Sequence, residues 1–155
     1  MKRISLLIIG IVFACVKVNA QDYDWAVGVR LSDFMGGISI KKSINAKDKI
    51  EGIFAVPYWH GVNLTGLYER EIFTIDERLQ LFCGAGAHTG SWKYKNNDVN
   101  KNYFFFGVDA IAGIEYTFAS IPLSFSIDYK PSFNIVGHSG FNFAGGGIAF
   151  RYTFF

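Results

Sequence analysis

Residues 123–130 read LSFSIDYK, a stretch in which apolar and polar side chains alternate at every step. One face carries Leu123, Phe125, Ile127 and Tyr129, and the other carries Ser124, Ser126, Asp128 and Lys130. Successive side chains of a β-strand point to opposite sides. An alternation with a period of two therefore predicts a strand that has one face in an apolar medium.

The same period recurs along most of the chain. We predict eight strands, near residues 24–32, 36–44, 49–58, 61–70, 78–90, 102–118, 122–133 and 141–154. No stretch shows a sustained helical period, so the sequence predicts an all-β protein.

The connections between these strands differ in length. Asn45–Asp48 and Ala119–Ile121 are short, whereas Ser91–Asn102 and Asn134–Gly140 are longer and polar. Short turns at one end and longer loops at the other are typical of transmembrane barrels. Arg70–Glu77 is the exception, because we expect it to be a long turn at the short-turn end.

The polar face favours the inside of a narrow barrel over the outside of a soluble one. It is rich in Gly, Ser and Ala and carries about one charge per strand, fewer than a water-exposed surface needs. Aromatic residues gather at both ends of the apolar face, as they do at lipid–water boundaries. The expected inner rim has Tyr23, Trp25, Tyr68, Tyr116, Phe118, Tyr152 and Phe154, and the outer rim has Tyr58, Trp59, Trp92 and Tyr103. We therefore predict an eight-stranded antiparallel up-and-down transmembrane β-barrel.

Nine charged residues fall on the inward face of this predicted barrel. They are Arg30, Lys41, Lys130 and Arg151, and Glu51, Glu69, Asp109, Glu115 and Asp128. Unpaired charges are costly in a lumen too narrow for bulk water. The near-balance of four cations and five anions predicts an ionic network that plugs the lumen.

The N-terminus has the pattern of a secretory signal. Lys2 and Arg3 precede an apolar stretch, and small residues lead to Ala20. We expect a signal peptide at 1–20, cleaved after Ala20 in the Sec pathway, and a barrel domain at 21–155. A lipidating cut before Cys15 is the alternative. Loss of three basic residues with the signal leaves 12 basic against 13 acidic residues, a net charge of −1 that does not indicate nucleic acid as a partner.

The segments GIEYTFASIPLSFSIDYKPSFNIVG, residues 113–137, and GGGIAFRYTFF, residues 145–155, look like the last strands of a known family. The chain resembles the small eight-stranded outer-membrane β-barrel proteins of Gram-negative bacteria, the OmpA- and OmpX-like barrels, most closely the Bacteroidota type. The resemblance implies an outer-membrane location and contact with membrane lipids. The terminal aromatic strand is similar to the signal read by the barrel-assembly machinery, although Phe155 follows the expected last aromatic residue, Phe154.

Two groups of residues could carry chemistry. His60, His88 and His138 map to the outer end, but their spacing matches no compact metal-ligand motif, and we predict no metal and no cofactor. His138 and Ser139 resemble the His–Ser pair of outer-membrane lipid A deacylases. In those enzymes one residue separates the pair, whereas here the two are adjacent between glycines, which favours a loop tip.

We therefore expect a non-enzymatic outer-membrane protein with a plugged lumen, whose outer loops serve binding, adhesion or membrane integrity. A small porin and an outer-leaflet lipid-modifying enzyme are the alternatives. A protein partner in the outer membrane is also possible, because small outward residues on the fourth and fifth strands would make a flat contact surface. These residues are Gly66, Cys83, Ala85 and Ala87.

Overall fold

The computed structural model describes residues 23–32, 35–57, 61–76, 78–96, 99–137 and 140–155, with backbone alone for 93–96 and 99–102. The expected signal peptide and both expected cleavage points lie outside the described residues. None of the described residues forms a helix that is long and apolar enough to cross a membrane.

The described residues contain ten β-strands in one antiparallel sheet. They are β1 (Trp25–Ser32), β2 (Met35–Ser43), β3 (Asp48–Pro57), β4 (Gly61–Asp76), β5 (Leu79–Asn96), β6 (Val99–Thr117), β7 (Leu123–Tyr129), β8 (Ser132–Val136), β9 (Gly140–Asn142) and β10 (Gly146–Phe154). Each strand pairs with the next from β1 to β7, and β7 also pairs with β10.

The ten strands form a wall of eight. β7 and β8 both pair with β6 and are separated only by Lys130 and Pro131, so they are two halves of one wall strand. Pro131 cannot donate a backbone hydrogen bond, which accounts for the break. β9 and β10 are likewise two halves of the last wall strand, because β9 pairs with β8 while β10 pairs with β7.

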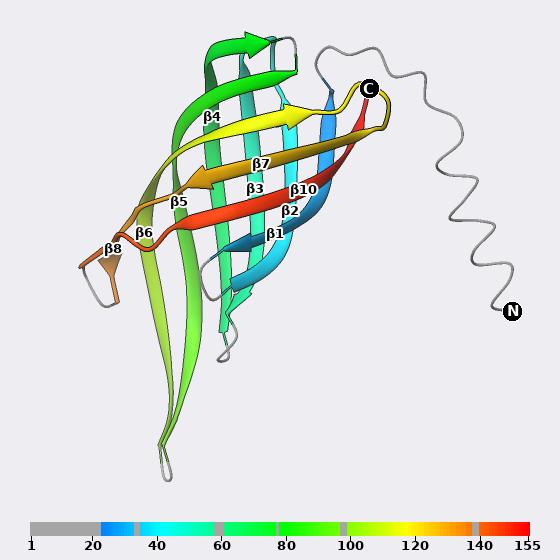
Figure 1. The fold of residues 1–155 in the computed structure, drawn as a ribbon. Helices are drawn as coiled ribbons and strands as arrows, with labels where there is room; N and C mark the ends of the chain where they lie inside the picture. Colours follow the sequence, from blue (N-terminus) through cyan, green and yellow to red (C-terminus); the bar gives the residue numbers. More distant parts are fainter. Residues whose placement is uncertain (1–22, 33–34, 58–60, 77, 97–98, 138–139) are drawn as a thin grey trace, which may run out of the picture.

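The C-terminal strand closes the barrel. β10 pairs with β1 over the whole length of β1, from Trp25 opposite Phe154 to Ser32 opposite Gly147. The sheet therefore has no open edge along this seam (Figure 1). The prediction of an all-β, eight-stranded antiparallel up-and-down barrel is confirmed.

The two ends of the barrel are distinct. We call the end where β1 begins and β10 finishes the terminal end. The opposite end is the hairpin end, where the β5–β6 hairpin extends well beyond the rest of the wall (Figure 1).

Several strands are longer than the sequence predicted. The expected loop Ser91–Asn102 is mostly hairpin, since β5 runs to Asn96 and β6 starts at Val99. The expected turn Arg70–Glu77 was also wrong, because β4 continues to Asp76 and pairs with β5 through two register shifts. Polarity suggested loops in both places. Water contacts both faces of a two-stranded ribbon that extends past the barrel. The alternation of apolar and polar side chains is therefore lost there, although the backbone pairing continues.

Side chains are distributed inside out relative to a soluble domain. Among the described residues, 16 polar or charged side chains are buried against eight apolar or aromatic ones. Large apolar side chains cover the outer surface, as shown by Val29 and Phe150, which pair across the seam and are 55% and 53% exposed. The buried face is therefore the lumen.

Most described aromatic residues of the expected inner rim point outward. Trp25, Tyr68 and Phe154 are exposed at the terminal end. The assignment of Trp92 and Tyr103 to the outer rim was wrong. Both are exposed towards the hairpin end, but Trp92 has the same parity as buried His88 and so lies on the lumen side, and Tyr103 pairs with Trp92 on that face. Tyr58 and Trp59 lie outside the described residues. The assignment of Tyr23 was wrong, because its side chain is fully buried inside the barrel. Tyr23 precedes β1, so the alternation of that strand does not fix its direction.

Candidate functional site: the lumen

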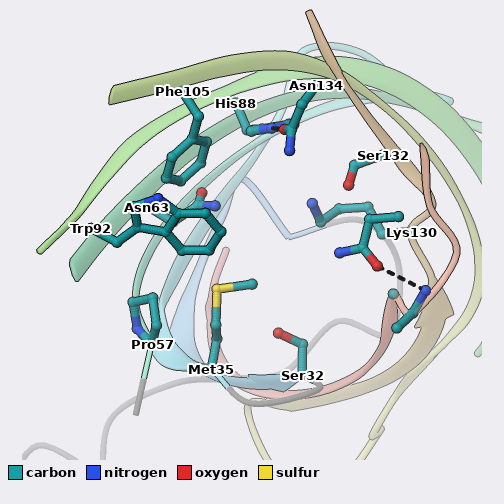
Figure 2. A pocket seen from close by; sticks show the side chains of 13 residues that line it. Ser32, Met35, Pro57, Asn63, His88, Trp92, Phe105, Lys130, Ser132 and Asn134 are labelled. Atoms are coloured by element: carbon teal, nitrogen blue, oxygen red, sulfur yellow. Dashed lines mark hydrogen bonds between the residues drawn. The ribbon is translucent and has the colours of Figure 1, made fainter. Parts of the chain in front are cut away.

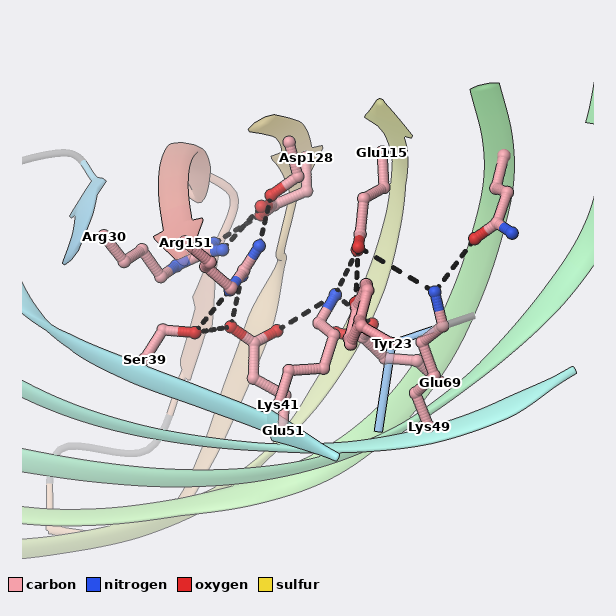
Figure 3. A network of polar contacts seen from close by, with 12 residues as sticks. Tyr23, Arg30, Ser39, Lys41, Lys49, Glu51, Glu69, Glu115, Asp128 and Arg151 are labelled. Carbon is pink, nitrogen blue, oxygen red and sulfur yellow. Dashed lines mark hydrogen bonds and ion pairs between the residues drawn. The ribbon is translucent and has the colours of Figure 1, made fainter. Parts of the chain in front are cut away.

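An ionic network fills the lumen towards the terminal end (Figure 3). We define it as Tyr23, Arg30, Ser39, Lys41, Lys49, Glu51, Glu69, Glu115, Asp128 and Arg151. Its members come from β1, β2, β3, β4, β6, β7 and β10, apart from Tyr23, which precedes β1. Figure 3 shows their polar ends converging from these different strands.

Lys41 lies at the centre of the network. Its Nζ atom is 2.7 Å from Glu69 Oε2 and 2.8 Å from Glu115 Oε2. Glu51 Oε2 lies farther away, at 3.8 Å. Because the Lys41 side chain has no exposed surface, these carboxylates take the place of water around the ammonium group.

Arg151 holds the neighbouring part of the network. Its Nη2 donates to Glu51 Oε1 at 2.5 Å, its Nε donates to Ser39 Oγ at 2.7 Å, and its Nη1 donates to Ser126 Oγ at 2.8 Å. Ser39 Oγ in turn donates to Glu51 Oε1 at 2.5 Å. A guanidinium offers donors in a fixed planar fork, so these partners fix its position as well as neutralise its charge.

Arg30 forms a two-point ion pair with Asp128. Nη1 donates to Oδ2 at 2.5 Å, and Nη2 donates to Oδ1. Gly147 stands between the two residues, since it pairs with Ser32 on one side and with Asp128 on the other. A Cβ atom at Gly147 would lie 2.5 Å from Arg30 Nη2. The small residue therefore provides the space through which the arginine crosses β10.

Two further members complete the charge balance. Lys49 Nζ donates to Gln80 Oε1 at 2.9 Å and lies 3.8 Å from Glu115 Oε1. Tyr23 donates its hydroxyl to Glu115 Oε1. With Lys49 included, four cations (Arg30, Lys41, Lys49 and Arg151) meet four carboxylates (Glu51, Glu69, Glu115 and Asp128) in the described lumen.

An apolar cluster lies beside this network. Ile53, Ala55, Leu67, Phe82 and Ile111 are buried together inside the barrel, with Met35 packed against them. Lys41 Nζ lies 4.6 Å from the centre of the Phe82 ring, so the cluster is continuous with the network.

A second polar group, the His88 cluster, lies nearer the hairpin end. We define it as His88, Asp109, Lys130 and Asn134. Asp109 is its centre, with Oδ2 at 2.9 Å from His88 Nδ1 and Oδ1 accepting from Lys130 Nζ at 2.7 Å. His88 Nε2 lies 2.8 Å from Asn134 Oδ1. Gly107 makes this reach possible, because a Cβ atom there would lie 2.6 Å from His88 Cε1.

The His88 cluster borders a cavity of about 210 Å³, which we call the vestibule. It opens at the hairpin end, where β1 and β3 finish and β2 begins. Its lining is Ser32, Met35, Pro57, Asn63, His88, Trp92, Phe105, Lys130, Ser132, Asn134, Asn142, Ala144 and Gly145. Figure 2 shows Trp92, Phe105, Pro57 and Met35 on one side and Lys130 and Ser132 on the other.

The structure places the nine predicted lumen residues in two groups. Seven belong to the ionic network, and Asp109 and Lys130 belong to the His88 cluster. The sequence interpretation left out Tyr23, Ser39, Lys49 and His88. Alternation contained the signal for the last three. Ser39 shares the face of Lys41 on β2, and Lys49 shares the face of Glu51 on β3. His88 pairs with Gly107, which shares the face of Asp109 on β6.

The other candidate residues fall outside this lumen. His60, His138 and Ser139 lie outside the described residues. Within the described ranges, no group of three or more His, Cys, Asp and Glu side chains is arranged to hold a metal ion. Cys83 is a free, exposed thiol on the outer surface, beside the equally exposed Ala85.

Comparison with known proteins identifies the fold. The sequence matches no protein-family model and no curated protein. The structure is similar to the crystal structure of the N-terminal β-barrel domain of Pseudomonas aeruginosa OprF, with a TM-score of 0.69 and 13% sequence identity. The match covers 84% of this chain and 95% of that one. The two chains share the barrel fold.

Proposed function

We propose that this chain is an integral outer-membrane β-barrel protein of a Gram-negative bacterium, of the Bacteroidota type. The observation that carries the proposal is the inverted distribution of side chains. An exposed apolar surface of this extent would make the protein aggregate in water, because contiguous apolar patches on soluble monomers are small. A closed barrel also satisfies its backbone hydrogen bonds internally, as hydrocarbon requires. The fold shared with the OprF barrel domain is consistent with this placement.

The role that we propose is non-enzymatic, with a lumen closed to ions. The ionic network and the apolar cluster occupy the space that a permeant ion would need. An eight-stranded barrel leaves an interior just wide enough for side chains to fill. The buried carboxylates and cations pair with one another, so a structural role is enough to explain their presence in the lumen.

Conductance across a planar lipid bilayer tests the closed lumen. The refolded mature chain, added to a bilayer in molar KCl, is expected to insert without steady conductance steps. Steady steps in the nanosiemens range would show a small porin instead. Insertion itself is checked in parallel by protection of the barrel from protease in liposomes of the same lipid.

The part of the protein that we propose for contact with other molecules is the hairpin end. The β5–β6 hairpin projects beyond the wall there, and we propose that it serves binding, adhesion or membrane integrity on the cell surface. Lipids, the barrel-assembly machinery during biogenesis and an outer-membrane protein are the partners that this placement would allow.

A further inference from the structure

The vestibule differs from the rest of the described lumen because its two sides have opposite chemistry. One side is aromatic and apolar, with Trp92 packed against Phe105 at a ring-centre distance of 5.6 Å and an angle of 49° between the ring planes. Phe105 continues towards His88, with ring centres 5.8 Å apart. Gly90 makes room for this column, since a Cβ atom there would lie 2.4 Å from Phe105 Cζ. An aromatic surface is thus built into the wall.

The facing side presents a cation with donors to spare. Lys130 Nζ gives one hydrogen bond to Asp109, and an ammonium group has three protons. The Lys130 side chain keeps 14% of its surface exposed, whereas the Asp109 side chain has none. Among the described residues that line the vestibule, none is a carboxylate. The cavity therefore presents positive charge, although an acid lies behind its surface.

His88 does not compete for a ligand. Both of its ring nitrogens are occupied, one by Asp109 and one by Asn134. Its function in the cluster is to hold Asp109, and through Asp109 the position of Lys130. The amide and hydroxyl groups of Asn63 and Ser132 add neutral hydrogen-bonding capacity to the same cavity.

The size and closure of the vestibule limit what fits. Its volume of about 210 Å³ is below the range of roughly 300–1,000 Å³ for drug-sized ligands. Met35 lines the cavity and also packs against the apolar cluster, so the cavity has a solid floor. A ligand would enter and leave by the hairpin end.

We propose that the vestibule binds small cyclic carboxylates, with the ring against Trp92 and Phe105 and the carboxylate on Lys130. Aromatic acids and sugar acids share this chemistry, because each combines a ring that has an apolar face with one negative group. The inference does not depend on the membrane location of the protein and can be tested in detergent.

The test is calorimetric titration of the refolded mature chain with benzoate and with glucuronate. Benzyl alcohol and glucose are the uncharged counterparts. We expect one saturable site for at least one acid and binding at least tenfold weaker for its uncharged counterpart, because a charge-assisted hydrogen bond is lost. The acid that binds more tightly identifies the aromatic or the sugar source.

Variants assign the site. Lys130→Gln is expected to weaken acid binding about tenfold or more and to leave the uncharged compounds unchanged. Trp92 belongs to neither the ionic network nor the His88 cluster. Trp92→Leu is expected to weaken the binding of the acid and of its uncharged counterpart to a similar degree. Lys47→Gln, an exposed lysine in the turn at the terminal end, is the matched control and should change nothing.

Two results would overturn the proposal. One is the absence of saturable binding by either acid to the folded wild-type chain. The other is acid binding that Trp92→Leu leaves unchanged, which places the ligand elsewhere. If Lys130→Gln does not fold, the comparison of acid and uncharged compound on the wild type still decides the role of charge.

Discussion

The ionic network and the vestibule show two ways of filling the same barrel. In the network, four cations and four carboxylates from strands around the wall contact one another and leave only a small cavity, of about 10 Å³, beside Lys49, Glu69 and Glu115. In the His88 cluster, a single carboxylate, Asp109, pairs with both His88 and Lys130, and the vestibule remains beside them. The lumen is therefore closed where long side chains of opposite charge match one another, and the barrel keeps room for a ligand where that matching ends.

Loss of Arg151 should destabilise the network more than any other change considered. Arg151→Ala leaves Glu51 buried without its main partner, and removal of one member of a buried pair costs about 3–5 kcal/mol. Denaturant unfolding in detergent, followed by tryptophan fluorescence, measures the change in the free energy of unfolding. Arg70→Ala is the control, because that side chain is 64% exposed and its pair with Asp48 is at 3.8 Å. Equal losses in the two variants would contradict a structural role for the network.

Replacement of a whole pair separates charge from space filling. Asp128→Leu alone strands Arg30, and we expect it to destabilise by about 3 kcal/mol or more. Adding Arg30→Met removes the stranded cation and should recover about half of that loss or more, since apolar replacements of buried pairs are often neutral. The same unfolding measurement gives the coupling energy. A double variant no better than the single one would show that this pair is needed as charges.

Adding a methyl group at a glycine should cause a smaller loss of stability. Gly147→Ala places a methyl group against the Arg30 guanidinium and should cost about 1–3 kcal/mol, as overpacking does. Gly66→Ala is the matched control, because a Cβ atom there meets nothing within 4 Å and the position faces outward. If both substitutions are neutral, the crossing of Arg30 over β10 does not constrain the barrel.

Much of this arrangement was predictable because alternation determines which way each side chain points. Arg30, Lys41 and Arg151 were placed in the lumen from period two alone. Tyr23 was not, since it precedes its strand, and the apolar cluster was not, since Phe82 and Ile111 are apolar residues on the polar face. Phe105 has the same parity as the inward Asp109, but it lies in a run of aromatics from Tyr103 to Phe106, so composition gave no sign that it lines a cavity. Which charges pair depends on distances across the lumen that no local pattern contains.

Salt should have the smallest effect and should distinguish buried from exposed pairs. Raising NaCl to about 1 M shortens the screening length to about 3 Å. We expect the penalty of Arg70→Ala, about 1 kcal/mol or less, to vanish. The penalty of Arg151→Ala should persist, because its partners have almost no exposed surface. A penalty at Arg151 that disappears with salt would mean that water enters the network.

In a membrane, the apolar face of the barrel should contact hydrocarbon and the polar face should not. Nitroxide labels placed one at a time along β10 on a Cys83→Ser background, in liposomes, test it by their collision rates with oxygen and with a water-soluble nickel complex. We predict high oxygen and low nickel accessibility at Ile148 and Phe150, and loss of this lipid signature at Ala149 between them. Nickel accessibility at Ile148 and Phe150 equal to that of an exposed site in water, such as Lys47, would contradict the account.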